Sequence, residues 1–163
     1  MRKQGGFTLL ELLVVVLIIG ITLGLVTISF TPDKAGMLAT ETQRLAALLR
    51  LTVQEAILQD QEYALEVTPE GYRFLVLNAQ HWQPVDDPLL RARKLPKDQR
   101  LAIYFDGRPF DFLKDEQAQN PRVYILSSGE ITPVELVIQT EDGAIKTHLT
   151  TSISGKIAVA DDL

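Results

Sequence analysis

An uncharged apolar stretch near the N-terminus is the feature that most constrains how this chain can fold. From Leu12 to Ile28 every residue is apolar except two glycines and two threonines, and no charge follows Glu11 until Asp33. Extended to Phe30, the stretch has about 19 residues and would form a helix roughly 28 Å long, close to the hydrocarbon thickness of a bilayer. The sequence therefore predicts one membrane-spanning helix.

The charges on either side of this stretch predict its orientation. Arg2 and Lys3 precede it, so the positive-inside rule keeps the N-terminus in the cytoplasm and sends the rest of the chain across the membrane. Beyond residue 30 the chain carries 14 basic and 20 acidic side chains, a net charge of −6. An acidic body has no general attraction for phosphate backbones, which argues against nucleic acid as a partner. The chain has no cysteine, which excludes disulfides, thiolate metal sites and a cysteine nucleophile.

Three interpretations of the N-terminal segment compete. A cleaved secretory signal would have a shorter apolar core, with the cleavage site after it. A plain signal anchor explains the length but not the residues that precede it. The third interpretation rests on residues 3–12, Lys-Gln-Gly-Gly-Phe-Thr-Leu-Leu-Glu-Leu, which resemble the type III signal of type IV pilins and type II secretion pseudopilins.

This resemblance implies a processing site. In that family a short basic leader ends in glycine, a peptidase cuts on the cytoplasmic side of the apolar stretch, and the new N-terminal phenylalanine is methylated. Carried over to this chain, residues 1–6 would be the leader, cleavage would fall between Gly6 and Phe7, and Phe7 would be methylated. Glutamate stands at the fifth mature position of the family, which is Glu11 here.

Glu11 has two possible roles. An ionised carboxylate at the edge of the hydrocarbon costs a few kcal/mol unless it finds a partner. The methylated amine of Phe7 in a neighbouring subunit would supply that partner and would set the stagger between helices in a filament. The local alternative is a capping box, because residues 8–11 have the S/T-x-x-E spacing. Because the Gly6–Phe7 junction lies close to Glu11 in the sequence, we favour the filament role.

Helical periodicity resumes after Pro32, which could bend or briefly break the helix. Residues 31–60 are expected to continue the membrane helix of residues 7–30 as an amphipathic helix, giving one nearly continuous helix from Phe7 to about Leu58. One face of this helix is predicted to be apolar and to contain Leu38, Leu45, Leu48, Leu49, Thr52, Val53, Ala56 and Ile57. We expect the opposite face to carry Glu41, Arg44, Arg50 and Glu55.

Residues 61–163 contain short β runs separated by turn sequences. Pro69-Glu70-Gly71 and Asp142-Gly143 predict hairpins. The predicted strands are 63–67, 72–77, 101–105, 123–126, 134–140, 144–150 and 153–159. Strands without intervening helices imply antiparallel sheets. The predicted fold class is therefore α+β, with a long N-terminal helix packed on a two-sheet antiparallel sandwich.

A second resemblance lies in residues 123–138. An apolar strand, a turn of small residues ending at Gly129, Pro133 and another strand are similar to the C-terminal pattern of the H-type minor pseudopilins. That family has a long helix and a β-sandwich, which agrees with the fold predicted from the residues. A related class of minor pilins shares the domain.

The two histidines are the first candidates for catalytic or metal-binding chemistry in the rest of the chain. His81 and His148 have no second metal-type ligand at helical or hairpin spacing, and no catalytic or phosphate-binding motif is present. We expect His81 and Trp82 to lie in a loop and His148 to be a surface or half-buried strand residue. The sequence therefore predicts no enzyme, no metal and no cofactor.

Five cations crowd into ten residues of an otherwise acidic body. They are Arg91, Arg93, Lys94, Lys97 and Arg100. One interpretation is a solvated loop before the strand at 101–105. The other is an electrostatic contact with an acidic neighbouring subunit or, with less support, with DNA.

These observations predict a structural minor pseudopilin of a type II secretion pseudopilus that assembles near the filament tip. The resemblance implies three kinds of partner: major and minor pseudopilins, a prepilin peptidase that also methylates, and an inner-membrane assembly platform. The expected location is the bacterial inner membrane, single-pass, with a periplasmic globular domain that moves into the pseudopilus on assembly. A minor pilin of a type IV pilus is the main alternative, followed by a single-span envelope binding protein.

Overall fold

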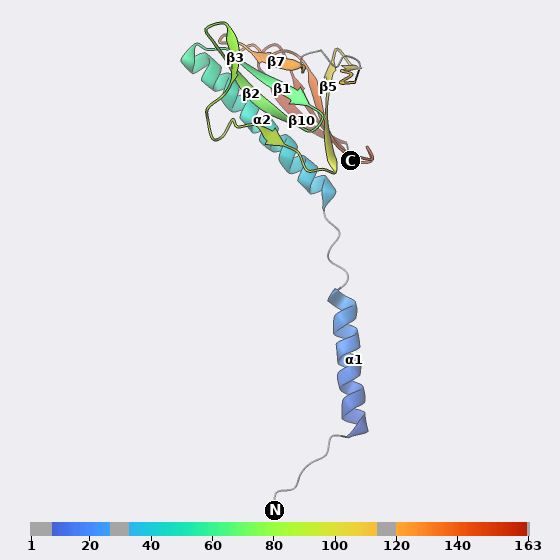
Figure 1. Cartoon of the computed structure of the whole chain (residues 1–163). Helices are drawn as coiled ribbons and strands as arrows, with labels where there is room; N and C mark the ends of the chain where they lie inside the picture. Colours follow the sequence, from blue (N-terminus) through green and yellow to red (C-terminus); the bar gives the residue numbers. More distant parts are fainter. Residues whose placement is uncertain (1–7, 27–32, 114–119, 163) are drawn as a thin grey trace, which may run out of the picture. The chain divides into compact units, whose positions relative to one another are not determined.

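The chain forms two compact units, Met1–Asp33 and Lys34–Leu163 (Figure 1). The computed structural model describes residues 8–26, 33–113 and 120–162. The first unit contains helix α1 (Leu9–Val26), and the second contains helix α2 (Lys34–Gln59) and the strands. Both helices were predicted.

The predicted continuity between the two helices falls on residues 27–32, which lie outside the described residues. Whether Pro32 breaks the helix therefore stays a prediction. Within the described residues, no helix is both long and apolar enough to cross a membrane.

One face of α2 supplies a large part of the core. Leu38, Leu45 and Leu49 are fully buried, as the periodicity predicted. Two assignments were wrong. Ile57 is 52% exposed, because it lies in the last turn of α2 beside Gly129, which has no side chain to cover it. Glu41 was placed on the outer face but is only 7% exposed, because it forms an ion pair with Arg93.

The strands form two antiparallel five-stranded sheets. Sheet A has the order β3-β2-β1-β7, with the short β4 also paired to β2. Sheet B has the order β10-β9-β8-β5-β6. The strands of sheet A are β1 (Tyr63–Thr68), β2 (Gly71–Asn78), β3 (His81–Pro84), β4 (Arg93–Lys94) and β7 (Arg122–Ile125). Those of sheet B are β5 (Gln99–Phe105), β6 (Arg108–Pro109), β8 (Glu135–Thr140), β9 (Lys146–Thr151) and β10 (Ile157–Asp162).

Turn chemistry explains the strand predictions that succeeded. The pairing of Thr68 with Gly71 places Pro69 and Glu70 in the two-residue turn between β1 and β2. Gly143 adopts φ +69° in the loop between β8 and β9, a left-handed conformation that glycine takes without steric cost. Both hairpins are confirmed.

Two strand predictions were wrong. His81 and Trp82 lie in β3 rather than in a loop, because Ala79 and Gln80 form a tight turn with φ of +45° and +67°. Neither residue type signals such a turn. The last strand begins at Ile157 rather than at residue 153, because the preceding segment turns back through a Ser152 N–H bond to the Lys156 carbonyl at 3.0 Å. The short strands β4 and β6 were not predicted.

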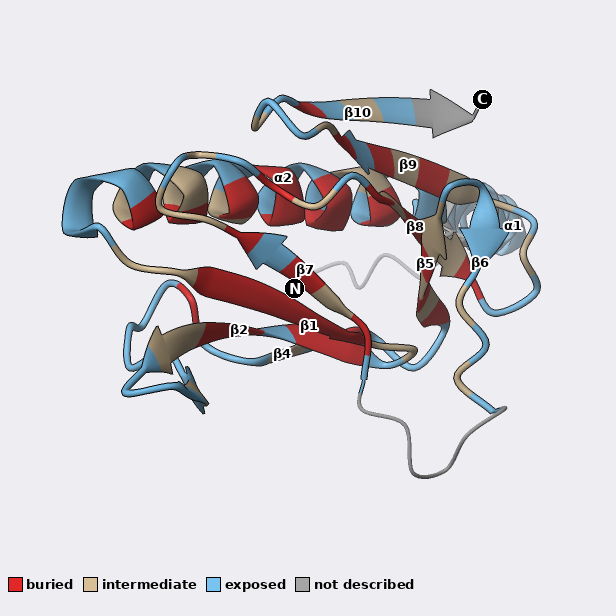
Figure 2. Cartoon of the chain, turned by 90° about the horizontal axis from the view of Figure 1, so that it is seen from above, coloured by how far each residue is buried: buried red, intermediate tan, exposed pale blue. Residues whose placement is uncertain are grey.

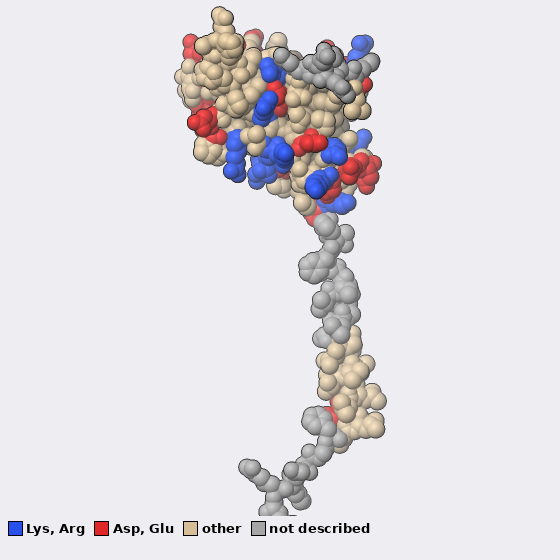
Figure 3. All heavy atoms as spheres, in the orientation of Figure 1, with Lys and Arg blue, Asp and Glu red and all other residues tan. Residues whose placement is uncertain are grey.

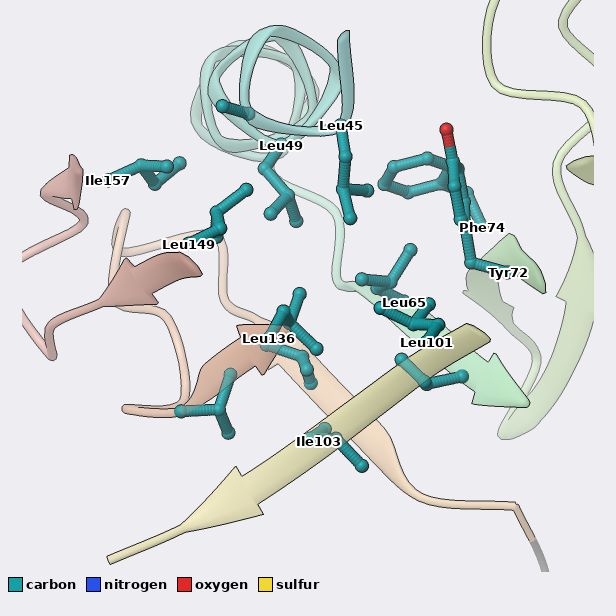
Figure 4. Close-up of a cluster of buried hydrophobic side chains, with 14 of the residues drawn as sticks. Leu45, Leu49, Leu65, Tyr72, Phe74, Leu101, Ile103, Leu136, Leu149 and Ile157 are labelled. Carbon is teal, nitrogen blue, oxygen red and sulfur yellow. The ribbon is translucent and has the colours of Figure 1, made fainter. Parts of the chain in front are cut away.

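The core lies between the two sheets and α2, with buried faces turned inward (Figure 2). Leu45 and Leu49 project from α2 towards Leu65 and Phe74 of sheet A and Leu149 of sheet B (Figure 4). Helix α2 contacts β8, β9 and β10 of one sheet and β7 of the other. This arrangement confirms the predicted fold class.

Candidate assembly site

The predicted processing site lies outside the described residues. Gly6 and Phe7 both fall within residues 1–7, so the cleavage position and the methylated amine stay predictions.

The first turn of α1 contains Glu11, the residue expected to pair between subunits. The Thr8 hydroxyl accepts a bond from the Glu11 backbone N–H at 3.4 Å, and the Thr8 carbonyl accepts one from the same N–H at 3.0 Å. Thr8 therefore caps the helix, which is half of a capping box. Within the described part of the chain, the exposed Glu11 carboxylate itself has no hydrogen-bond or ion-pair partner.

The basic stretch does not act as one group, because Arg93 is held by a buried acid. Arg93 Nε and Nη2 donate to Glu41 Oε1 and Oε2 at 2.6 and 2.9 Å. The Tyr72 hydroxyl donates to Glu41 Oε1 at 3.0 Å. Helix α2 and strands β2 and β4 therefore meet at one carboxylate. The charge of Arg93 is therefore neutralised inside the fold, and an interaction patch formed by the five cations stays a prediction.

The ionisation of this cluster follows from its geometry. Burial, and then the neighbouring Glu41 carboxylate, raise the pKa of Tyr72 far above its ordinary value, so the phenol stays protonated and donates. The hydrogen bonds to Glu41 raise the pKa of Arg93, which remains charged.

The other four cations of the stretch are placed differently. Arg100 Nη2 lies 3.3 Å from Glu141 Oε1 in a pair whose side chains are 40% and 65% exposed. Arg91, Lys94 and Lys97 are exposed, and no ion pair joins them to a described carboxylate. Most of the cations visible on this face of the globular unit gather over its lower half, where α2 begins (Figures 1 and 3).

A second buried acid organises sheet A. Glu66 on β1 accepts from Arg73 Nε at 2.7 Å and from Arg122 Nη2 at 2.9 Å, and Asn120 Nδ2 lies 3.4 Å away. Arg73 and Arg122 stand opposite Glu66 on the two neighbouring strands. Burial alone would favour the neutral acid, but the hydrogen bonds from Arg122 and Arg73 outweigh it and lower the pKa of Glu66.

Residues 123–138 carried the second resemblance. After β7 the chain turns at Gly129 and runs back beside β7, where Ile131 pairs with Ile125. Leu126 and Gly129 close its turn through a backbone bond of 2.9 Å, and the Thr132 N–H then bonds the Tyr124 carbonyl at 2.9 Å. An apolar hollow of about 380 Å³ lies here, lined by residues that include Tyr124, Pro133 and Ile153. The ring centroid of Trp82 is 5.6 Å from that of Tyr124, so Trp82 contacts the rim of this region.

The histidines are placed as follows. His148 lies on β9 and is half-buried, with Nδ1 2.6 Å from Glu135 Oε1, which confirms its predicted strand position. His81 is exposed on β3. Within the described ranges, no three His, Asp or Glu side chains group as metal ligands.

Sequence reasoning missed both buried acids. Glu41 follows Leu38 by three residues and precedes Leu45 by four, which is the spacing of the buried stripe itself, so the periodicity contained the signal. Glu66 gave no such signal, because its burial depends on the register that brings Arg73 and Arg122 opposite it.

Two family models match the chain. Residues 1–27 match the prokaryotic N-terminal methylation motif. Residues 41–155 match the type II transport protein GspH.

Curated relatives agree with these matches. The chain is 34% identical to the type II secretion system protein H of Pseudomonas aeruginosa over 146 residues, covering 83% of each chain. It is 28% identical to the protein of that name from Pectobacterium carotovorum, covering 98% of this chain and 94% of the relative. The Escherichia coli K12 protein of that name is 31% identical, covering 85% and 82%.

Solved structures support the same fold. A crystal structure of the minor pseudopilin EpsH from the type II secretion system of Vibrio cholerae superposes with a TM-score of 0.67 at 25% identity, covering 79% of this chain and 97% of that one. The solution structure of Escherichia coli GspH gives a TM-score of 0.60 at 20% identity, covering 81% and 94%. Since the family model spans more than half of the sequence and the fold agrees, the chain belongs to the type II transport protein GspH family.

Proposed function

We propose that this chain is a structural minor pseudopilin of a type II secretion pseudopilus, which assembles near the filament tip and helps to export folded proteins across the outer membrane. The observation that carries this proposal is the presence of both family matches, methylation motif and GspH, on one chain. The alternative of a type IV minor pilin is not favoured, because the relatives reported above are all named as type II secretion proteins.

The proposed life of the subunit begins in the inner membrane. A prepilin peptidase would remove residues 1–6 on the cytoplasmic side and methylate Phe7. The segment 7–30 would anchor the subunit as a single pass, with the globular unit in the periplasm. The methylation motif over residues 1–27 supports this order of events.

Assembly would then bring the anchor out of the bilayer among the equivalent helices of other pseudopilins. The Glu11 carboxylate, exposed in the first turn of α1, would meet the Phe7 amine of a neighbour. A charge pair of this kind removes the cost of carrying an isolated carboxylate in an apolar bundle. The proposed role is mechanical, driven from the cytoplasm through the inner-membrane assembly platform, and it requires no catalytic group.

The experiment that tests this function compares culture-medium proteins of a clean deletion strain with those of the complemented strain. We expect folded exoproteins to accumulate in the periplasm of the deletion strain only. An unchanged medium would contradict the secretion role and would direct attention to twitching and DNA uptake.

A further inference from the structure

The segment 88–97, named here the basic loop, combines exposed cations with an exposed leucine. Leu90 and Leu95 are 4% and 8% exposed and anchor the loop in the core. Leu89 is 65% exposed. The Asp87 carboxylate accepts bonds from the N–H groups of Leu89 and Leu90 at 2.6 and 3.4 Å, which fixes the backbone that presents Leu89.

The charge of the basic loop is not cancelled where it is exposed. Glu41 neutralises Arg93, which serves to hold the loop to α2. In the described part of the chain Arg91, Lys94 and Lys97, with Arg44 of α2, have no carboxylate within ion-pair distance. A positive surface therefore stands on a globular unit that is acidic as a whole.

The basic loop also has an apolar element between its cations. Arg44, Arg91 and Leu89 line a hollow of about 280 Å³ together with Leu48, Pro88 and Ala92. Cations around an exposed aliphatic side chain fit a lipid surface, because the cations meet phosphates while the aliphatic group enters the acyl boundary.

The chain itself keeps this surface within reach of a membrane. Between residue 30, where the apolar stretch ends, and Lys34, where α2 begins, the backbone spans at most about 14 Å. Glu41, which holds Arg93 and so the basic loop, lies about 10 Å further along α2. A subunit anchored by residues 7–30 would carry the basic loop close to the headgroups on the far side of the bilayer.

We propose that the basic loop, with Arg44, binds anionic phospholipid headgroups while the anchored subunit awaits assembly. The proposal rests on the membrane anchoring in the proposed function. The short tether and the exposed Leu89 favour lipid over an acidic neighbouring subunit. Contact with the bilayer holds the globular unit at the membrane, and assembly into the filament releases it.

The absence of cysteine makes a direct test possible, because single-cysteine variants can be labelled at one chosen position. The full chain is reconstituted in vesicles of phosphatidylcholine, alone or mixed with phosphatidylglycerol, that contain a lipid-bound quencher. A dye is attached through Leu89→Cys, through Ile153→Cys as a control of similar exposure at 63%, or through Val16→Cys in α1.

We expect the dye at position 89 to be quenched only in the anionic vesicles, the dye at 153 in neither, and the dye at 16 in both. Replacing Arg91, Lys94 and Lys97 with Gln should weaken the contact of the loop with the surface about a hundredfold, since each cation near an anionic surface contributes about 1 kcal/mol. High salt should have the same effect.

The outcomes separate the two proposals. Equal quenching at 89 and 153, with position 16 quenched, overturns lipid binding and leaves the anchoring intact. If the dye at position 89 is not quenched by lipid and becomes shielded from solvent only after other pseudopilins are added, the basic loop binds an acidic protein surface instead. The lipid proposal is then wrong. Absence of quenching at position 16 overturns the anchoring itself.

Discussion

Arg93 and Glu41, 52 residues apart in the chain, form a two-point ion pair that fastens β4 to α2. The Tyr72 hydroxyl bonds the same carboxylate from β2. Three elements that meet only in the folded state thus share one buried charge. The pair has a structural role first, and it also sets where the unpaired cations of the basic loop are held.

Removing Arg93 should destabilise the globular unit. Arg93→Met leaves Glu41 buried with only Tyr72 as a donor, and breaking a buried pair is costly. The Arg93 side chain is 35% exposed, so we expect about 2 kcal/mol rather than the full cost of a dry pair. Urea unfolding of residues 34–163, followed by the fluorescence of the single tryptophan, measures the change. Arg100→Met, which breaks an exposed pair, is the matched control and should cost less than about 0.5 kcal/mol. Equal effects would contradict the structural role of Glu41.

The pair of arginines at Glu66 predicts acid sensitivity. The folded-state pKa of Glu66 lies below its ordinary value of 4.5, so its stabilising effect is complete above that value and is lost as the pH falls through the folded pKa. Glu66→Gln should therefore be less stable than the parent at neutral pH, and the gap should narrow below about pH 4.5. Urea midpoints measured across this range test it. Because Asp142 also has a lowered pKa and is present in both proteins, the comparison isolates Glu66. A gap that is constant with pH would show that the ion pairs do not stabilise the fold.

Gly155 should tolerate no side chain. Its φ is +77°, and an added Cβ would lie 2.7 Å from the backbone carbonyl oxygen of Gly129. Gly155→Ala therefore combines backbone strain with a clash against main chain, and we expect a loss of about 2–3 kcal/mol. Gly143 has a similar φ of +69° but open space around it, so Gly143→Ala should cost only about 1 kcal/mol. Thermal or urea unfolding of both variants compares them, and similar losses would mean that the close approach to Gly129 does not matter.

Two substitutions at the start of α1 separate the two roles considered for Glu11. Glu11→Gln removes the charge that would meet the Phe7 amine and keeps a good helix former. Thr8→Ala removes the capping hydroxyl and keeps the charge. We expect Glu11→Gln to be cleaved but to be lost from sheared filaments, and Thr8→Ala to be recovered in them. The opposite pattern would assign Glu11 a capping role only.

The cleavage position can be tested by enlarging the side chain at Gly6, next to the Gly6–Phe7 peptide bond. Gly6→Val places a branched side chain at the scissile peptide, so we expect the uncut precursor to accumulate. Intact mass and N-terminal sequencing distinguish it from a mature chain that begins at Phe7. Gly5→Val, one bond away, is the control and should still be processed. A processed Gly6→Val product would count against the assigned junction.

Much of the fold could be predicted because its signals are local. The apolar stripe of α2 and the Asp142-Gly143 turn each depend on residues close together in the sequence. The turn at Ala79 and Gln80 escaped prediction because tertiary pairing of β2 with β3 imposes positive φ on residues that do not favour it.

The candidate site was harder to predict, because its polar contacts are long-range. The sequence showed five neighbouring cations but not that Arg93 would turn inward to Glu41. The burial of Glu66 likewise depends on two strand registers at once. Gly6 and Phe7 were identified from a local motif, and their role still awaits the experiment above.

The contacts of Glu41 with Arg93 and Tyr72 have a mechanical consequence. A pull that enters the globular unit through Lys34 is carried first by α2, and Glu41 lies about two turns into that helix. Arg93 and Tyr72 tie this point to β4 and β2, while Leu45 and Leu49 bury the next turns in the core. The load is therefore shared among several side-chain contacts that act in parallel. A subunit built in this way resists unfolding from the point at which Glu41 is held.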